Sequence, residues 1–104
     1  MAVSAYVLVK CQGGMVAEVA QRLLKGGHVK AVDTLFGDYD LIAYLEVEEM
    51  LDTFSVGKLD EIVIKEIART KGVVSTNTHI VTTPRALREI QQRPSIKERP
   101  RRES

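Results

Sequence analysis

Residues 28–47, HVKAVDTLFGDYDLIAYLEV, contain two apolar runs that are separated by the tetrapeptide GDYD at positions 37–40. Runs rich in β-branched and aromatic residues on either side of a short Gly/Asp element are typical of a β-hairpin. The pattern therefore predicts two antiparallel strands, over residues 28–36 and 41–47, with the tetrapeptide as their turn.

Outward from this hairpin, strand and helix signals alternate along the chain. A β-rich run over residues 3–12 ends at a glycine pair, and residues 15–25 carry one apolar stripe at helical spacing. A second helix is predicted to start at Asp52 or Ser55 and to end at Lys71-Gly72, before a last strand over residues 73–82. Its apolar stripe consists of Leu59, Ile62, Val63 and Ile67, and its outer side of Asp60, Glu61, Lys65, Glu66 and Arg69, while Ile64 departs from the stripe.

The order β-α-β-β-α-β predicts an α+β, ferredoxin-like fold, in which a four-stranded antiparallel sheet carries both helices on one face. The strands are apolar on both faces: Ala5, Val7 and Val9 alternate with Tyr6 and Leu8. The third strand repeats the pattern, with Leu41, Ala43, Leu45 and Val47 opposite Ile42 and Tyr44. An antiparallel sheet with one wet face alternates apolar and polar residues. We therefore expect a second copy to cover the helix-free face, as in a dimeric α+β barrel.

Charge divides the chain into two parts. Residues 1–84 hold eight Lys/Arg and eleven Asp/Glu, a net charge of −3, whereas residues 85–104 hold seven Lys/Arg and three Glu, a net charge of +4. We expect a folded domain over 1–84 and a basic, largely disordered extension over 85–104. Arg85 to Gln92 can form a helical turn or two. Glutamates and the lack of aromatic residues favour a solvated tail over a nucleic-acid-binding one.

The sequence lacks the features expected of a membrane, secreted, metal-binding or catalytic protein. No apolar run is long enough to span a membrane, and the N-terminus does not have the pattern of a signal peptide. Cys11 is the single cysteine, and neither it nor His28 or His79 has partners at metal-ligand or catalytic spacing. We expect a cytoplasmic protein that has no enzymatic activity, no cofactor and no metal, with Cys11 buried and His79 a sheet residue.

Two polar elements are candidate ligand sites. In the turn, Gly37 can take the positive φ of a tight reversal. The carboxylates of Asp38 and Asp40 flank Tyr39 and can hold a cationic amine; alternatively, the aspartates only satisfy backbone amides of a hairpin. At the start of the last strand, small hydroxyl and amide side chains can bind a ligand carboxylate; alternatively, they form the wet side of an edge strand. The sequence leaves both alternatives open.

From about Ala5 to Thr82 the chain resembles the C-terminal effector domain, or RAM domain, of Lrp/AsnC (feast/famine) transcriptional regulators. The resemblance is carried by YVLV at 6–9, GDYDL at 37–41, and KGV at 71–73 leading into STNT at 75–78. It implies pairing of sheets into dimers, assembly into octamer-like rings, and binding of an amino acid or similar small effector between dimers. The implied ligand-binding residues are Gly37, Asp38, Tyr39, Asp40, Ser75, Thr76 and Thr78.

Full-length members of that family carry a helix-turn-helix ahead of this domain, and here the first strand begins close to Met1. We therefore expect a stand-alone effector domain that does not bind DNA directly and that can co-assemble with full-length Lrp/AsnC regulators. The extension past Pro84 is expected to lie outside the family pattern. The alternative is a small dimeric enzyme of the same fold, such as a cofactor-free monooxygenase, with His79, His28 or Tyr44 in an enclosed cavity. The identity of the effector and the number of subunits stay open.

Overall fold

The computed structural model describes residues 2–48, 56–83 and 85–91. The elements follow one another in the predicted order β-α-β-β-α-β, with one further helix at the end. They are β1 (Ala2–Cys11), α1 (Val16–Leu23), β2 (Val29–Thr34), β3 (Leu41–Glu48), α2 (Val56–Val63), the π-helical segment η1 (Ile64–Ala68), β4 (Val73–Ile80) and α3 (Arg85–Gln91).

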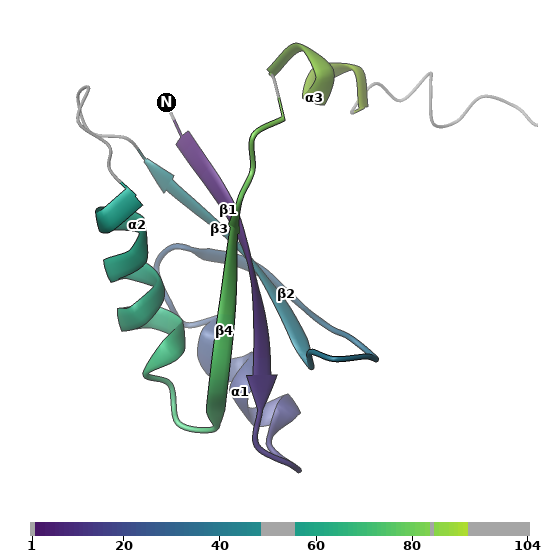
Figure 1. Cartoon of the computed structure of the whole chain (residues 1–104), viewed down its shortest axis with the longest axis vertical. Helices are drawn as coiled ribbons and strands as arrows, with labels where there is room; N and C mark the ends of the chain where they lie inside the picture. The colour runs from purple at the N-terminus through teal and green to yellow at the C-terminus, as the bar shows by residue number, and fades with distance from the viewer. Residues whose placement is uncertain (1, 49–55, 84, 92–104) are drawn as a thin grey trace, which may run out of the picture.

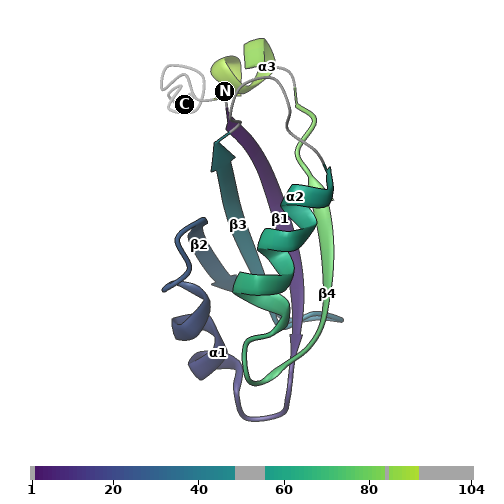
Figure 2. The ribbon, with the colours of Figure 1, turned by 90° about the vertical axis from the view of Figure 1, so that its left-hand side faces the viewer.

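The four strands form one antiparallel sheet in the order β2-β3-β1-β4, with β1 and β3 in the centre. Both α1 and α2 lie on the same side of this sheet, and α3 lies beyond its end (Figures 1 and 2). This arrangement confirms the predicted ferredoxin-like fold with two helices on one face.

Alternate residues of the strands face opposite sides of the sheet, as the sequence predicted. Ala5, Val7 and Val9 of β1 are completely buried against the helices, together with the alternate residues of β3 that pair beside them. On the other side, Tyr6 is 42% exposed, and its ring lies 5.1 Å from that of Tyr44, centroid to centroid. The helix-free side is called the open face below; its central residues are Ser4, Tyr6, Leu8, Lys10, Ile42, Tyr44, Ser75, Asn77 and His79.

Helix α1 packs on the sheet through Val19 and Leu23, both fully buried members of the predicted stripe. It is shorter than the predicted span of 15–25. The backbone amides of Lys25 and Gly26 donate to the carbonyls of Arg22 and Leu23, at 3.2 and 3.0 Å, so the last turn tightens before the glycine pair.

The second helix packs through Leu59, Val63 and Ile67, and Ile64 departs from this stripe as predicted, with 41% of its surface exposed. The helix changes to π-type at Ile64, where the amide of Arg69 donates to the Ile64 carbonyl at 3.1 Å. The placement of Glu66 on the outer side was wrong. Its carboxylate is half-buried and accepts bonds from the amide of His28 at 3.1 Å and from the His28 ring at 2.5 Å.

Strand β2 is also shorter than predicted, because Leu35 and Phe36 belong to the loop and not to the strand. The Leu35 amide donates to the Asp40 carbonyl at 2.8 Å, which closes the loop over residues 35–40. Phe36 is consequently fully exposed at the tip of the hairpin.

At the C-terminal end, α3 confirms the helical turns predicted over residues 85–92. The predicted helix caps Asp52 and Ser55, and the disorder predicted from Arg93 onward, lie outside the described residues. Within the described ranges, no helix combines the length and the apolar character that crossing a membrane requires.

Candidate functional site

The β2–β3 loop is fixed to the end of β1 by Asp40. The backbone amide of Asp40 donates to the Val9 carbonyl at 2.9 Å, and its Oδ2 accepts from the amide of Cys11 at 2.8 Å. The Asp40 carboxylate therefore satisfies a backbone amide, which is the second of the two roles that the sequence left open for these aspartates.

Asp38 lies on the other side of the same loop and contacts Lys10. The Nζ atom of Lys10 donates to the backbone carbonyl of Asp38 at 2.9 Å. The side chain of Asp38 is exposed, and none of the described residues donates a hydrogen bond to its carboxylate or pairs with it. This carboxylate is therefore available to a cation from outside the chain.

Tyr39 reaches across the sheet. Its hydroxyl accepts a long hydrogen bond of 3.4 Å from the Nδ2 atom of Asn77 on β4. Because β1 lies between β3 and β4, the Tyr39 side chain crosses β1 to make this contact. Asn77 pairs with Leu8, whose neighbours Val7 and Val9 face the core, so the crossing takes place over the open face.

The start of β4 presents its polar residues to both faces. Ser75 pairs with Lys10 and Asn77 with Leu8, on the open face. Thr76 and Thr78 pair with the buried residues Val9 and Val7, which places them on the side of the helices, and both are half-buried there. A pocket on the open face can therefore include Ser75 but neither of the two threonines.

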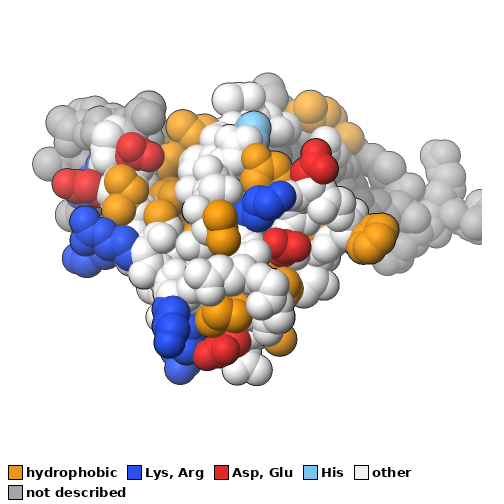
Figure 3. Space-filling view, turned by 60° about the horizontal axis from the view of Figure 1, so that its bottom comes forward, with side chains coloured by type: hydrophobic (Ala, Val, Ile, Leu, Met, Phe, Trp, Pro, Cys, Tyr) orange, Lys and Arg blue, Asp and Glu red, His pale blue; other side chains and the backbone are white. Residues whose placement is uncertain are grey.

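The side chains that meet at this end of the open face form a group called the hairpin corner below. It consists of Lys10, Asp38, Tyr39, Ser75 and Asn77. Figure 3, which brings this end of the molecule forward, shows basic and acidic side chains next to exposed hydrophobic ones. The structure thus brings the predicted residues Asp38, Tyr39 and Ser75 together with Lys10 and Asn77, which were not predicted. The predicted residue Asp40 is not part of the group, because its carboxylate binds the backbone amide of Cys11.

Gly37 stands at the tip of the loop. Its φ of +159° is close to the extended region, and a Cβ atom added there would meet nothing within 4 Å. A left-handed conformation at this glycine is therefore not what turns the chain.

Cys11 lies next to the hairpin corner but inside the core, as predicted. Burial, and secondarily the negative charge of Asp40, raise the pKa of its thiol. A thiol with a raised pKa is a poor nucleophile at neutral pH, which favours the structural role.

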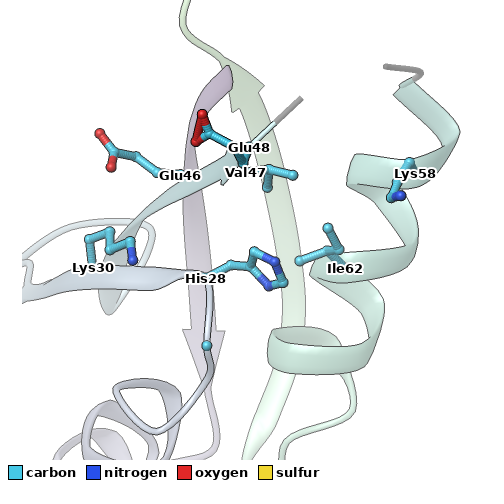
Figure 4. Close-up of a pocket in the computed structure, with 8 residues that line it drawn as sticks. His28, Lys30, Glu46, Val47, Glu48, Lys58 and Ile62 are labelled. Carbon is cyan, nitrogen blue, oxygen red and sulfur yellow. The ribbon is translucent and has the colours of Figure 1, made fainter. Parts of the chain in front are cut away.

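A concave region lies away from the hairpin corner, between the start of β2, the end of β3 and α2 (Figure 4). It has a volume of about 470 Å³, and the ring of His28 points toward Ile62 of α2 within it. The Nδ1 atom of His28 is bound to Glu66, which fixes the ring. His79 lies elsewhere, paired with Tyr6 on the open face, as a sheet residue. In the part of the chain that the structure describes, no three His, Cys, Asp or Glu side chains are grouped to hold a metal ion.

A family model described as the Lrp/AsnC ligand binding domain matches residues 4–96. The chain belongs to this family. The match continues past Thr82 and past Pro84, so the expectation that residues beyond Pro84 lie outside the family pattern was wrong. The residues 85–96 that it adds include α3.

Solved structures share the fold of this Lrp/AsnC ligand-binding domain. TTHA0845 from Thermus thermophilus is 26% identical with a TM-score of 0.67, and the match covers 79% of this chain and 95% of that one. The hypothetical protein PHS023 from Pyrococcus horikoshii is 26% identical with a TM-score of 0.62, over 80% and 93% of the two chains. Transcriptional regulator NMB0573 from Neisseria meningitidis, solved as an L-Met complex, is 15% identical with a TM-score of 0.63, over 80% of this chain and 51% of that one. A search of curated proteins gave no significant match.

Lys10 and Asn77 were missing from the predicted ligand-binding set. They lie 28 and 38 residues from their loop partners Asp38 and Tyr39, and only the register of the sheet brings them there. One signal was present in the sequence: residues 75 and 77 of a strand share one face, whereas 75 and 76 do not.

Proposed function

We propose that this Lrp/AsnC domain is a regulatory module that binds an amino acid or a similar small molecule and works as a homo-oligomer, without catalysing a reaction. The observation that carries the proposal is the hairpin corner. It places an exposed carboxylate, an oriented ammonium group and three neutral polar side chains at the rim of the open face, beside the apolar side chains of Leu8 and Ile42. Polar groups that converge beside apolar surface are typical of small-molecule sites.

The open face supports the proposed assembly. Tyr6 and Tyr44 pack together there, Leu8 and Ile42 lie beside them, and no described helix covers this side (Figure 2). Two sheets that pack face to face lie about 10 Å apart and interdigitate such side chains. We propose that a second copy covers this face, and that dimers then meet at their hairpin corners to enclose the effector.

An amino acid is the effector that the comparisons favour. The Neisseria regulator of the same fold is known as an L-Met complex. The predicted residues Gly37, Asp38, Tyr39 and Ser75 would contribute to the pocket on the open face. Thr76 and Thr78 stay predictions that this pocket does not require. A full-length Lrp/AsnC regulator presents a sheet of the same kind, and co-assembly with such a regulator is the second part of the proposal.

The enzyme alternative requires His79, His28 or Tyr44 in an enclosed cavity between sheet and helices. His79 and Tyr44 instead lie on the open face, and His28, whose ring points into the concave region beside α2, is bound there to Glu66. The described residues of the core are all apolar. These placements favour binding over catalysis.

A thermal-shift series with the twenty L-amino acids at millimolar concentration tests the proposal. A ligand at one hundred times its Kd stabilises the folded state by about 2.7 kcal/mol, which corresponds to about 10–20 °C in the melting temperature of a domain of this size. At least one amino acid is expected to raise the melting temperature, and a Tyr39→Phe variant, which lacks the hydroxyl bound to Asn77, is expected to respond less. A flat response to all twenty would overturn the proposal.

A further inference from the structure

Lys10 carries the one charge of the hairpin corner that neither the predicted site nor the family resemblance assigns. It is the penultimate residue of β1, and its side chain is exposed on the open face because Val9 and Cys11 on either side face the core. The bond from its Nζ atom to the Asp38 carbonyl fixes the direction of the ammonium group. One of its three donors is thus used, and two are left.

Lys10 forms no ion pair with another described residue. The ion pairs of Glu18 with Arg22 and of His28 with Glu66 lie elsewhere and do not include Lys10. A carbonyl oxygen orients an ammonium group but does not neutralise it. The corner therefore offers an oriented positive charge to an anion from outside the chain.

Neutral donors lie next to this charge. Ser75 is the direct cross-strand partner of Lys10, and side chains in such positions have their Cβ atoms about 5 Å apart. Asn77 follows on the same face and already directs its amide nitrogen toward the loop. An ammonium, a hydroxyl and an amide on one small area match the two oxygens of a carboxylate.

The exposed carboxylate of Asp38 narrows the class of ligand. It belongs to the residue whose carbonyl contacts Lys10, so a negative and a positive group stand side by side at the corner. A dianion such as phosphate would be repelled by Asp38, whereas an α-amino acid carries an ammonium and a carboxylate on the same carbon atom.

We propose that Lys10 binds the carboxylate of the effector, with Ser75 and Asn77 as flanking donors, while Asp38 binds its ammonium group. The inference rests on the proposed function and adds to it the orientation of the ligand. It predicts that a ligand whose carboxylate is replaced by an uncharged group binds more weakly, because it loses its interaction with the charge of Lys10.

The test combines one change in the ligand with one change in the protein and compares the four dissociation constants. The dissociation constants of the amino acid that stabilises the chain most, and of the same amino acid as its C-terminal amide, are measured by titration calorimetry for the wild type and for Lys10→Met. The wild type is expected to prefer the acid over the amide by about tenfold, the effect of a hydrogen-bonded charge pair at a partly exposed site. In Lys10→Met this ratio is expected to fall to near one.

Lys30→Met is the matched control, since it removes the same charge from an exposed lysine at the other end of the hairpin strands, and its acid-to-amide ratio should equal that of the wild type. Lys10→Arg, which keeps the charge, should retain most of the preference, and Lys10→Gln replaces Lys10→Met if the latter does not fold. An unchanged ratio in Lys10→Met, with binding intact, would overturn the role of Lys10 and leave the proposed function standing. Binding of no amino acid by the wild type would overturn both.

Discussion

Replacing Asp40 tests how the loop of the candidate site is fixed. In Asp40→Ala the amide of Cys11 loses its acceptor at 2.8 Å, while the backbone bonds from Asp40 to Val9 and from Leu35 to Asp40 are unaffected. Leaving a buried amide without a partner costs about 1–3 kcal/mol. Asp40 is only half-buried, so water can reach the site in part, and we expect a loss of about 1–2 kcal/mol in the free energy of unfolding. Asp40→Asn keeps an oxygen at this position and should lose less than about 1 kcal/mol.

Urea denaturation followed by circular dichroism measures this loss. A change of about 1 kcal/mol corresponds to about 4–8 °C in the melting temperature of a domain of this size, so a thermal scan resolves it as well. Asp38→Ala is the matched control: the same substitution two residues away removes a carboxylate that has no described partner and should change stability by less than about 0.5 kcal/mol. Equal stability of the two alanine variants would refute the assignment of Asp40 as the fixing residue.

Two further substitutions probe the surroundings of the site. Gly72 has a φ of +99°, and an added Cβ would lie 2.7 Å from Val19 Cγ2 and 2.9 Å from Met15 Cε, so Gly72→Ala should destabilise the chain by about 2–4 kcal/mol. Gly27→Ala, with nothing within 4 Å, is its control in the same urea titration, and equal midpoints for both would contradict the packing of α1 against this turn. Burial and then Asp40 raise the pKa of Cys11, so removing the charge in Asp40→Asn should lower that pKa, while burial keeps it above its ordinary value. The pH profile of iodoacetamide alkylation should therefore move to lower pH in that variant, and an unmoved profile would show that the charge of Asp40 does not reach the thiol.

The fold could be predicted from the sequence because each element carries its own periodic pattern. Val19 and Leu23 mark one face of α1, and Ala5, Val7 and Val9 mark the buried side of β1 by their parity alone. Even the exposure of Ile64 followed from its place off the stripe. Such patterns are local, and local patterns are what a single sequence contains.

The site could be predicted only in part, because it depends on contacts between distant residues. Glu66 was placed on the outer side because it is charged, although it follows Ile62 by four residues and Val63 by three and therefore falls on the buried side of a helix; its partner, the backbone amide of His28, is 38 residues away. The roles of Lys10 and Asn77 depend on a register that pairs β1 with β4, and this register shifts between Lys10 and Cys11. Neighbouring residues of a strand face opposite sides, so parity alone separates Ser75 from Thr76. The resemblance to the family nevertheless led to both being predicted as ligand-binding residues.

The mass of the chain in solution at micromolar concentration, by sedimentation equilibrium, tests most directly whether a second copy covers the open face. We predict a dimer or a multiple of it for the wild type, and a monomer of retained helix and strand content for Ile42→Glu, which puts a charge in the middle of that face. Ile64→Glu, the same change at an exposed isoleucine of η1, should leave the oligomer intact. A well-folded wild-type monomer would contradict the proposed assembly and, with it, a ligand pocket formed between dimers.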